Sequence, residues 1–157
     1  MAGGGLLDVG VYCLSLASMI FGEPARITGL ASLGQPGVDE QAGIVLLGKG
    51  GQIALLSCGV RTNTPHEAAV FGTDGMIRLH PRWWLGGKMT LTRAGKGPEE
   101  INVPVSENGF IYQVQEVHQC LAAGRTESEI MPLDETLSIL RTMDELRGQW
   151  GLRYPFE

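Results

Sequence analysis

The stretch Gly3-Gly4-Gly5-Leu6-Leu7-Asp8-Val9-Gly10-Val11-Tyr12 leads three glycines directly into an apolar segment that continues to Phe21. Asp8 and Tyr12 are four residues apart, so on an α-helix they are neighbours on one face. Apolar side chains cover almost every other direction, which predicts a helix that is buried on nearly all sides. Because an unpaired polar group in such surroundings is costly, we expect Asp8 and Tyr12 to face a partner, a cleft or a ligand.

A structural explanation of the same two residues stays open at this point. A carboxylate in the first turn of a helix, as at Asp8, is favoured by the helix dipole. Tyr12 can equally be a half-buried tyrosine whose hydroxyl group reaches the surface. The spacing alone does not decide between these roles and a catalytic one.

The composition restricts the class of protein. A chain of 157 residues can form one domain, residues 1–157, with an ordinary hydrophobic core. The net charge of −5, without a basic stripe, argues against nucleic acid as a partner. The apolar first helix is too short and too polar for a membrane span. We therefore expect a protein that binds neither nucleic acid nor membrane.

The cysteines and histidines do not form a recognisable metal or disulfide pattern. The three cysteines are odd in number and widely spaced, which predicts reduced thiols and a cytoplasmic location. The histidines are dispersed, without the spacing of metal ligands, so we expect no metal site. The residues concerned are Cys13, Cys58, Cys120, His66, His80 and His118.

The order of elements predicts an α+β fold. The first helix ends at Gly22, shortly before Pro24. Short runs rich in Ile, Val and Leu then predict strands over residues 26–33, 41–47, 52–60, 67–71, 76–79, 89–92 and 101–103. Two helices follow, over residues 110–123 and from Pro132 to Gly151. The pattern favours a mainly antiparallel, open-faced sheet with helices packed on one face.

Two of the predicted strands are apolar at consecutive positions, over residues 44–47 and 53–56. A strand with one wet face alternates apolar and polar residues instead. Because the helices cover only one face of the sheet, we expect a second copy of the chain to cover the other face. The sequence thus predicts a homodimer, or a higher homo-oligomer, formed through the sheet.

Three parts of the chain together resemble a known family. They are Gly3-Gly4-Gly5-Leu6-Leu7-Asp8-Val9-Gly10-Val11-Tyr12, then Phe71-Gly72-Thr73-Asp74-Gly75-Met76-Ile77, then Tyr112, Val117, Cys120, Leu121, Gly124, Pro132, Arg147, Gly151, Leu152, Tyr154 and Pro155. In this order they resemble the C-terminal domain of the glucose-fructose oxidoreductase/inositol dehydrogenase (Gfo/Idh/MocA) family. The likeness is greatest to the dihydrodiol dehydrogenase/xylose dehydrogenase branch, which has tyrosine where many sugar and inositol dehydrogenases have histidine.

The resemblance implies an NAD(P)-dependent oxidoreductase with a Rossmann domain that is absent from this chain. The glycines of residues 48–51 join two predicted strands and lack the spacing of a dinucleotide fingerprint. Met1 would then be a start introduced where the C-terminal half was cut from a longer enzyme, and the cofactor, NAD or NADP, would be held mainly by the N-terminal half.

The resemblance also implies roles for single residues of this chain. Tyr12 would be the acid/base of hydride transfer to or from a sugar, polyol or trans-dihydrodiol, and Asp8 would bind the substrate hydroxyl or relay the proton. A free tyrosine has a pKa near ~10, so Tyr12 needs a nearby cation, which the family supplies as a Rossmann-domain lysine. The remaining expectations are substrate contacts from Phe110 and Trp83 and a cofactor approach at Gly4 and Gly5.

The sequence therefore leaves two functions open. The first is the substrate-binding and oligomerisation domain of an NAD(P)-dependent oxidoreductase, a fragment that is inactive alone. The second is a stand-alone, non-catalytic α+β module that uses its apolar sheet for binding or assembly.

Overall fold

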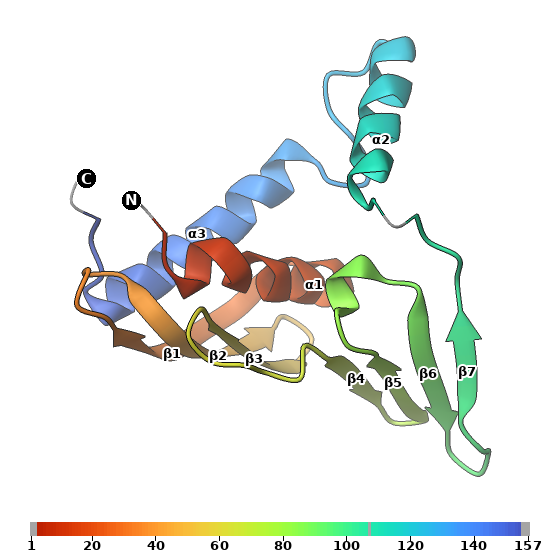
Figure 1. Cartoon of the computed structure of the whole chain (residues 1–157), viewed down its shortest axis with the longest axis horizontal. Helices are drawn as coiled ribbons and strands as arrows, with labels where there is room; N and C mark the ends of the chain where they lie inside the picture. Colours follow the sequence, from red (N-terminus) through yellow and green to blue (C-terminus); the bar gives the residue numbers. More distant parts are fainter. Residues whose placement is uncertain (1–2, 107, 155–157) are drawn as a thin grey trace. The chain divides into compact units, whose positions relative to one another are not determined.

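In the computed structural model, which describes residues 3–106 and 108–154, the chain divides into two units (Figure 1). The first unit comprises Met1–Asn63 and Glu127–Glu157, and the second comprises Thr64–Thr126. The expectation that the chain acts as one domain stays a prediction.

The first helix begins with a π-helical turn, η1 (Leu6–Gly10), and continues as α1 (Val11–Phe21). Its buried residues are spaced at three and four positions along one face: Leu6, Gly10, Leu14 and Ala17. The expectation of burial on nearly all sides is wrong for this chain, because Tyr12 is 50% exposed and Met19 is 74% exposed. The helix lies against a single layer, so its apolar residues on the far side have nothing to pack on within the first unit.

The first sheet has three antiparallel strands in the order β1 (Pro24–Leu33), β2 (Asp39–Gly48) and β3 (Ile53–Gly59). The expected loop at residues 48–51 is confirmed as the β2–β3 turn, with Gly51 at a φ of 84° that favours glycine. The register places Val45 opposite Thr28 on one side and opposite Leu55 on the other.

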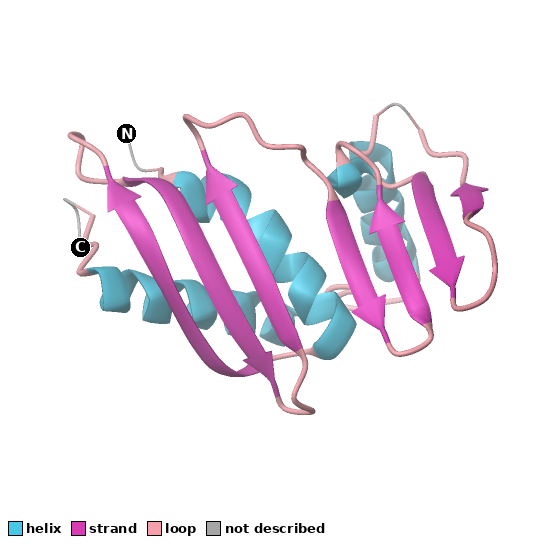
Figure 2. Cartoon of the chain, turned by 90° about the horizontal axis from the view of Figure 1, so that it is seen from below, coloured by secondary structure: helices cyan, strands magenta, loops and turns pink. Residues whose placement is uncertain are grey.

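Helix α3 (Leu133–Trp150) closes the first unit. It begins after Pro132 and ends at Gly151, which adopts a left-handed conformation with a φ of 64°, as the sequence pattern predicted. Helices α1 and α3 lie on the same face of β1–β3 (Figure 2). Between these layers lies the hydrophobic core: Leu6, Leu14, Ala17, Ile44, Leu46, Ile139, Met143 and Leu146.

The other face of this sheet is apolar and uncovered within the first unit (Figure 2). Leu30 is 84% exposed and Leu55 is 79% exposed, and Val45 and Ile53 are exposed as well. The consecutive apolar residues in β2 and β3 therefore divide between two faces, one under the helices and one open. We call Leu30, Val45, Ile53 and Leu55 the open apolar face.

The second unit contains a four-stranded antiparallel sheet and helix α2. The strands follow the chain order, β4 (Ala68–Gly72), β5 (Gly75–Leu79), β6 (Lys88–Arg93) and β7 (Glu99–Asn102), with the short 3-10 turn η2 (Trp83–Leu85) before β6. Helix α2 (Phe110–Ala122) follows. The expected α+β class with antiparallel pairing is thus confirmed.

Candidate functional site

The two predicted catalytic residues lie on one exposed face of the first helix. Asp8 stands in the π-helical turn and Tyr12 in the first turn of α1, and both side chains are exposed. Met19, two turns further on, is exposed too. At about 3.6 residues per turn, these three residues fall on the side of the helix opposite to its buried residues. The buried residues are Leu6, Gly10, Leu14 and Ala17. The Asp8 and Tyr12 side chains are both exposed, and their action as one pair stays a prediction.

The chemistry open to this face follows from the two groups. A carboxylate can accept a hydrogen bond from a substrate hydroxyl, and a phenol can give or take a proton within hydrogen-bond reach of a reacting oxygen. π-Helical turns occur often at functional sites because they redirect side chains within a helix. The catalytic roles of Asp8 and Tyr12 stay predictions.

The glycines that precede the helix pack against a buried acid. Gly4 and Gly5 are both buried, and a Cβ atom on Gly4 would collide with the carboxylate of Asp39. Asp39 itself is 0% exposed, and its Oδ2 accepts a hydrogen bond from the backbone N–H of Leu6. This contact explains the need for glycine at position 4 without a cofactor, so cofactor contact at Gly4 and Gly5 stays a prediction.

The sequence did not single out Asp39. An acidic residue that follows Gly37 and Val38 at the start of a strand is typical of a solvated turn. The run of three glycines was the available signal, because it indicates a close approach of the backbone to another group.

A small cavity of about 10 Å³ lies toward the other end of α1, next to β2 and α3. Its lining includes Leu14, Ser18, Leu46, Ile139 and Thr142, but neither Asp8 nor Tyr12. Such a volume holds one water molecule, whereas pockets for small ligands are of the order of 300 Å³ or more. This cavity is therefore not a substrate site.

The two predicted substrate contacts lie in the second unit. Phe110 is exposed at the first position of α2. Trp83 lies in η2, not in a strand, and packs edge-to-face on Trp84, with 6.1 Å between ring centroids. Trp84 packs in turn on His66 at 5.0 Å. Packing within the second unit thus accounts for part of the Trp83 surface, and substrate contacts of Phe110 and Trp83 stay predictions.

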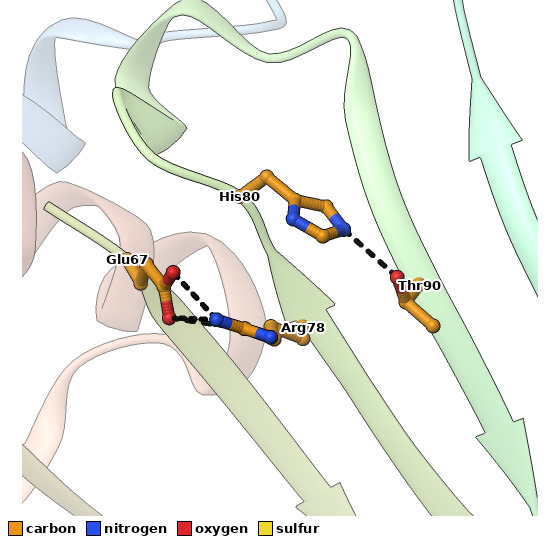
Figure 3. A network of polar contacts seen from close by, with 4 residues as sticks. All are labelled: Glu67, Arg78, His80 and Thr90. Carbon is orange, nitrogen blue, oxygen red and sulfur yellow. Dashed lines mark hydrogen bonds and ion pairs between the residues drawn. The ribbon is translucent and has the colours of Figure 1, made fainter. Parts of the chain in front are cut away.

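A polar network crosses strands β4–β6 (Figure 3). Arg78 donates two hydrogen bonds from Nη2 to Glu67, of 2.6 and 2.8 Å, and a third from Nε of 3.0 Å. This guanidinium holds the pKa of the Glu67 carboxyl below its ordinary value. His80 Nε2 lies 2.8 Å from Thr90 Oγ1. The charges of Glu67 and Arg78 are satisfied by each other, and His80 has a partner in Thr90. Contacts between neighbouring strands therefore explain these four polar residues.

Burial disfavours ionisation of the Cys13 and Cys58 thiols. Burial raises the pKa of Cys58 to about 12 and also raises the pKa of Cys13. None of the three cysteines forms a disulfide bond in the described residues. In the part of the chain that the structure describes, no three His, Cys, Asp or Glu side chains gather as a metal site, and no helix has the length and apolar character needed to cross a membrane.

The described residues do not provide a dinucleotide-binding fold. Such a fold needs parallel strands and a glycine-rich turn from a strand into a helix. Every strand pair within residues 3–106 and 108–154 is antiparallel, and the glycines before η1 follow no strand of that range. The residues that the structure describes therefore do not by themselves fit NAD or NADP.

Comparison with known proteins gives a consistent result. A sequence model described as the GFO/IDH/MocA C-terminal domain matches residues 1–78. The trans-1,2-dihydrobenzene-1,2-diol dehydrogenase of Xenopus laevis is 34% identical over 163 residues, which cover 99% of this chain and 49% of that protein. The chain thus spans about half the length of the curated relatives that it matches.

Solved structures agree on the fold. An aldose-aldose oxidoreductase from Caulobacter crescentus, complexed with glycerol, matches with a TM-score of 0.80 and 24% identity over 94% of this chain and 45% of that one. A 3-ketoreductase from Actinomadura kijaniata, in complex with NADP, matches with a TM-score of 0.75 and 20% identity over 94% of this chain and 48% of that one. At these identities, the likeness shows a shared fold.

Proposed function

Because this chain belongs to the Gfo/Idh/MocA family and corresponds to its C-terminal domain, we propose that it is the substrate-binding and oligomerisation half of an NAD(P)-dependent oxidoreductase. One observation carries the proposal. Asp8 and Tyr12 stand together on the exposed face of a helix whose opposite face is fixed in the core.

In this proposal Tyr12 handles the proton and Asp8 the substrate hydroxyl. Oxidation of an alcohol breaks its C–H and O–H bonds, and the nicotinamide, when bound, takes the hydride. Tyr12, as the phenolate, accepts the hydroxyl proton, and returns it when the reaction runs toward the alcohol. Asp8 accepts a hydrogen bond from a neighbouring hydroxyl of the substrate, and this contact orients the reacting hydroxyl toward Tyr12.

The substrate class is a secondary alcohol or the corresponding carbonyl of a sugar, polyol or trans-dihydrodiol. The names of the relatives support this choice, since they include a dihydrodiol dehydrogenase and an aldose-aldose oxidoreductase. Phe110 and Trp83 are the aromatic side chains that we assign to substrate contact. Both are partly or largely exposed, and a planar aromatic surface suits the apolar face of a sugar or a dihydrodiol ring.

The cofactor, NAD or NADP, is held in this proposal mainly by an N-terminal Rossmann domain outside this chain. A family neighbour is known in complex with NADP. The described residues provide no dinucleotide fold, so the isolated chain should bind NADPH only weakly. Calorimetric saturation of this chain by NADPH at micromolar concentrations would contradict this part of the proposal.

The open apolar face is the proposed oligomer contact. Leu30, Val45, Ile53 and Leu55 form a continuous apolar set on adjacent strands, and exposed patches of this kind mark interaction surfaces. A second copy of the same sheet presents the same surface, as a twofold dimer requires. The absence of a disulfide bond among the described cysteines favours a reducing compartment, so we place the protein in the cytoplasm.

A turnover screen of the whole protein tests the proposal. The protein that carries this chain is incubated with NAD or NADP and with aldoses, inositols and trans-dihydrodiols, and reduced cofactor is followed by absorbance at 340 nm. We expect cofactor reduction with at least one of these classes. If none reacts and the natural reading frame starts at Met1, the stand-alone binding or oligomerisation module becomes the better function.

A further inference from the structure

A buried carboxylate lies beneath the start of the first helix and is used by none of the chemistry above. Asp39, at the first position of β2, is 0% exposed. Burial of a carboxylate is costly unless hydrogen bonds compensate for the lost water. Its Oδ2 accepts the Leu6 N–H, whereas Oδ1 accepts no hydrogen bond from the residues that the structure describes. The fold thus keeps a costly group at this position.

The Asp39 carboxylate contacts the segment that carries Asp8 at two residues, Gly4 and Leu6. The first N–H groups of a helix have no partner within the helix, and the Asp39 carboxylate supplies one for Leu6. Gly4 packs directly on the same carboxylate, and the Gly4 carbonyl accepts the Asp8 N–H at 3.1 Å. One acid therefore contacts both Gly4, two residues before the π-helical turn, and Leu6, the first residue within it.

Charged and titratable groups of other elements also face this acid. Burial has the largest effect on the Asp39 carboxyl and raises its pKa above the ordinary value, whereas the Leu6 N–H and, more weakly, Arg147 of α3 lower it. On β3, Cys58 lies near enough for the Asp39 charge to raise the pKa of its thiol. Asp39 therefore contacts η1 and lies within electrostatic range of groups on β3 and α3.

We propose that Asp39 is a positioning residue, which holds the π-helical turn so that Asp8 and Tyr12 point together toward the substrate. The proposal rests on the function proposed above. Asp39 cannot touch a substrate itself, because no part of its side chain reaches the surface. Its effect would pass through the backbone of residues 4–8, and a misplacement of about 1 Å in a catalytic group can cost on the order of 100-fold in rate.

The test uses two variants of the whole protein. Asp39→Ala removes the acceptor, whereas Asp39→Asn keeps the shape and a neutral, weaker acceptor. We expect kcat to fall at least 10-fold for Asp39→Ala and about 2- to 5-fold for Asp39→Asn, with the KM for the nicotinamide cofactor unchanged. Asp74 is exposed at the β4–β5 turn, so Asp74→Ala and Asp74→Asn are matched controls that should keep kcat within 2-fold.

A second readout separates positioning from simple loss of stability. Each Asp39 variant is repeated in the Tyr12→Phe background, at a temperature where all proteins are folded by circular dichroism. If Asp39 acts by positioning Tyr12, its replacement in the Tyr12→Phe background should lower kcat by less than 2-fold relative to Tyr12→Phe alone. An equal loss with and without the Tyr12 hydroxyl would overturn the proposal. Should Asp39→Ala fail to fold, the Asp39→Asn variant tests the proposal in its place. An unchanged kcat of Asp39→Asn in the protein that retains Tyr12 would overturn the positioning role of Asp39.

Amide hydrogen exchange distinguishes failure of this proposal from failure of the proposed function. In Asp39→Asn we expect faster exchange at residues 6–10 than in the unmodified protein, whether or not a substrate is known. A protein without NAD(P)-linked turnover but with this local change would contradict the enzyme function, and with it the role in catalysis, while leaving Asp39 as the anchor of the turn. Active protein with unchanged exchange and unchanged kcat would overturn the positioning role alone.

Discussion

The two faces of the first helix differ more than its sequence suggests. Leu6 and Leu14 are buried on the β1–β3 sheet, whereas Tyr12 and Met19, on the opposite face, are largely exposed. Apolar residues occur on both faces, but the carboxylate and the phenol occur only on the exposed one. The difference teaches that one face of this helix fixes its position and that the other is available for chemistry.

The largest expected effect comes from the exposed face. In the whole protein, Tyr12→Phe removes one hydroxyl group, and we expect turnover to fall by about 10²–10⁴, the usual contribution of general acid–base catalysis. Thermal stability should change little, because the side chain is half exposed. Steady-state kinetics at saturating cofactor gives the measurement.

Tyr112→Phe is the matched control for this change. Tyr112 lies in α2, where its hydroxyl accepts a hydrogen bond from the Ser106 N–H at 2.7 Å. Turnover of Tyr112→Phe should stay within a few-fold of the unmodified protein. Equal turnover for the Tyr12 and Tyr112 variants would remove Tyr12 from the mechanism.

The buried face should respond in stability and not in chemistry. Leu14→Ala removes a core side chain, and we expect the free energy of unfolding to fall by about 2–5 kcal/mol. Met19→Ala, on the exposed face of the same helix, should change it by no more than about 0.5 kcal/mol. Urea unfolding followed by circular dichroism measures both, and similar values for the two variants would show that the faces are wrongly assigned.

The two faces of the β1–β3 sheet offer a further comparison. Leu55→Glu places a charge on the open apolar face. We expect the dissociation constant of the dimer to increase by about 30-fold, which corresponds to a loss of roughly 2 kcal/mol in the free energy of association. Ile130→Glu introduces the same charge at another exposed apolar residue and should leave association unchanged. Light scattering over a concentration series gives both values. A monomeric unmodified chain at micromolar concentration would rule out the predicted dimer.

The smallest expected effect is a pH dependence of stability. Burial raises the pKa of Asp39 above its ordinary value of 3.8, so the folded state holds this proton more tightly than the unfolded state. The contribution of protonated Asp39 to the free energy of unfolding is fully present below pH 3.8. This contribution is lost as the pH rises through the higher pKa that Asp39 has in the folded state. The side chain of the Asp39→Asn variant does not titrate, so only the unmodified protein loses this contribution. The free energy of unfolding of Asp39→Asn minus that of the unmodified protein should therefore increase as the pH rises above about 4.

Urea unfolding at several pH values between 3.5 and 7 measures this difference. Asp74→Asn, at an exposed site, serves as the control and should show no such trend. A difference between the Asp39 proteins that is independent of pH would indicate that Asp39 titrates normally in the folded state.

Much of the fold could be predicted from the sequence because local signals and burial agree. The glycine at 151 and the proline at 132 set the ends of α3, and the apolar runs of β2 and β3 sit on two faces as expected. The π-helical turn could not be predicted, since its residues have the same spacing pattern as an α-helix.

The candidate site was predicted only in part. The four-residue spacing of Asp8 and Tyr12 was sufficient to place them on one face. Asp39 was missed because its burial depends on a contact with Gly4 and Leu6, more than thirty residues away in the chain. Burial of an acid through long-range packing leaves no local pattern in the sequence.

The most direct measurement is a double-mutant cycle in turnover with Asp8→Asn, Tyr12→Phe and the combined variant of the whole protein. If the two side chains handle one proton as a unit, the combined variant should be about as slow as the slower single variant. Losses that simply multiply would mean that Asp8 and Tyr12 act independently, and unchanged turnover in all three would mean that this face of the helix takes no part in the reaction.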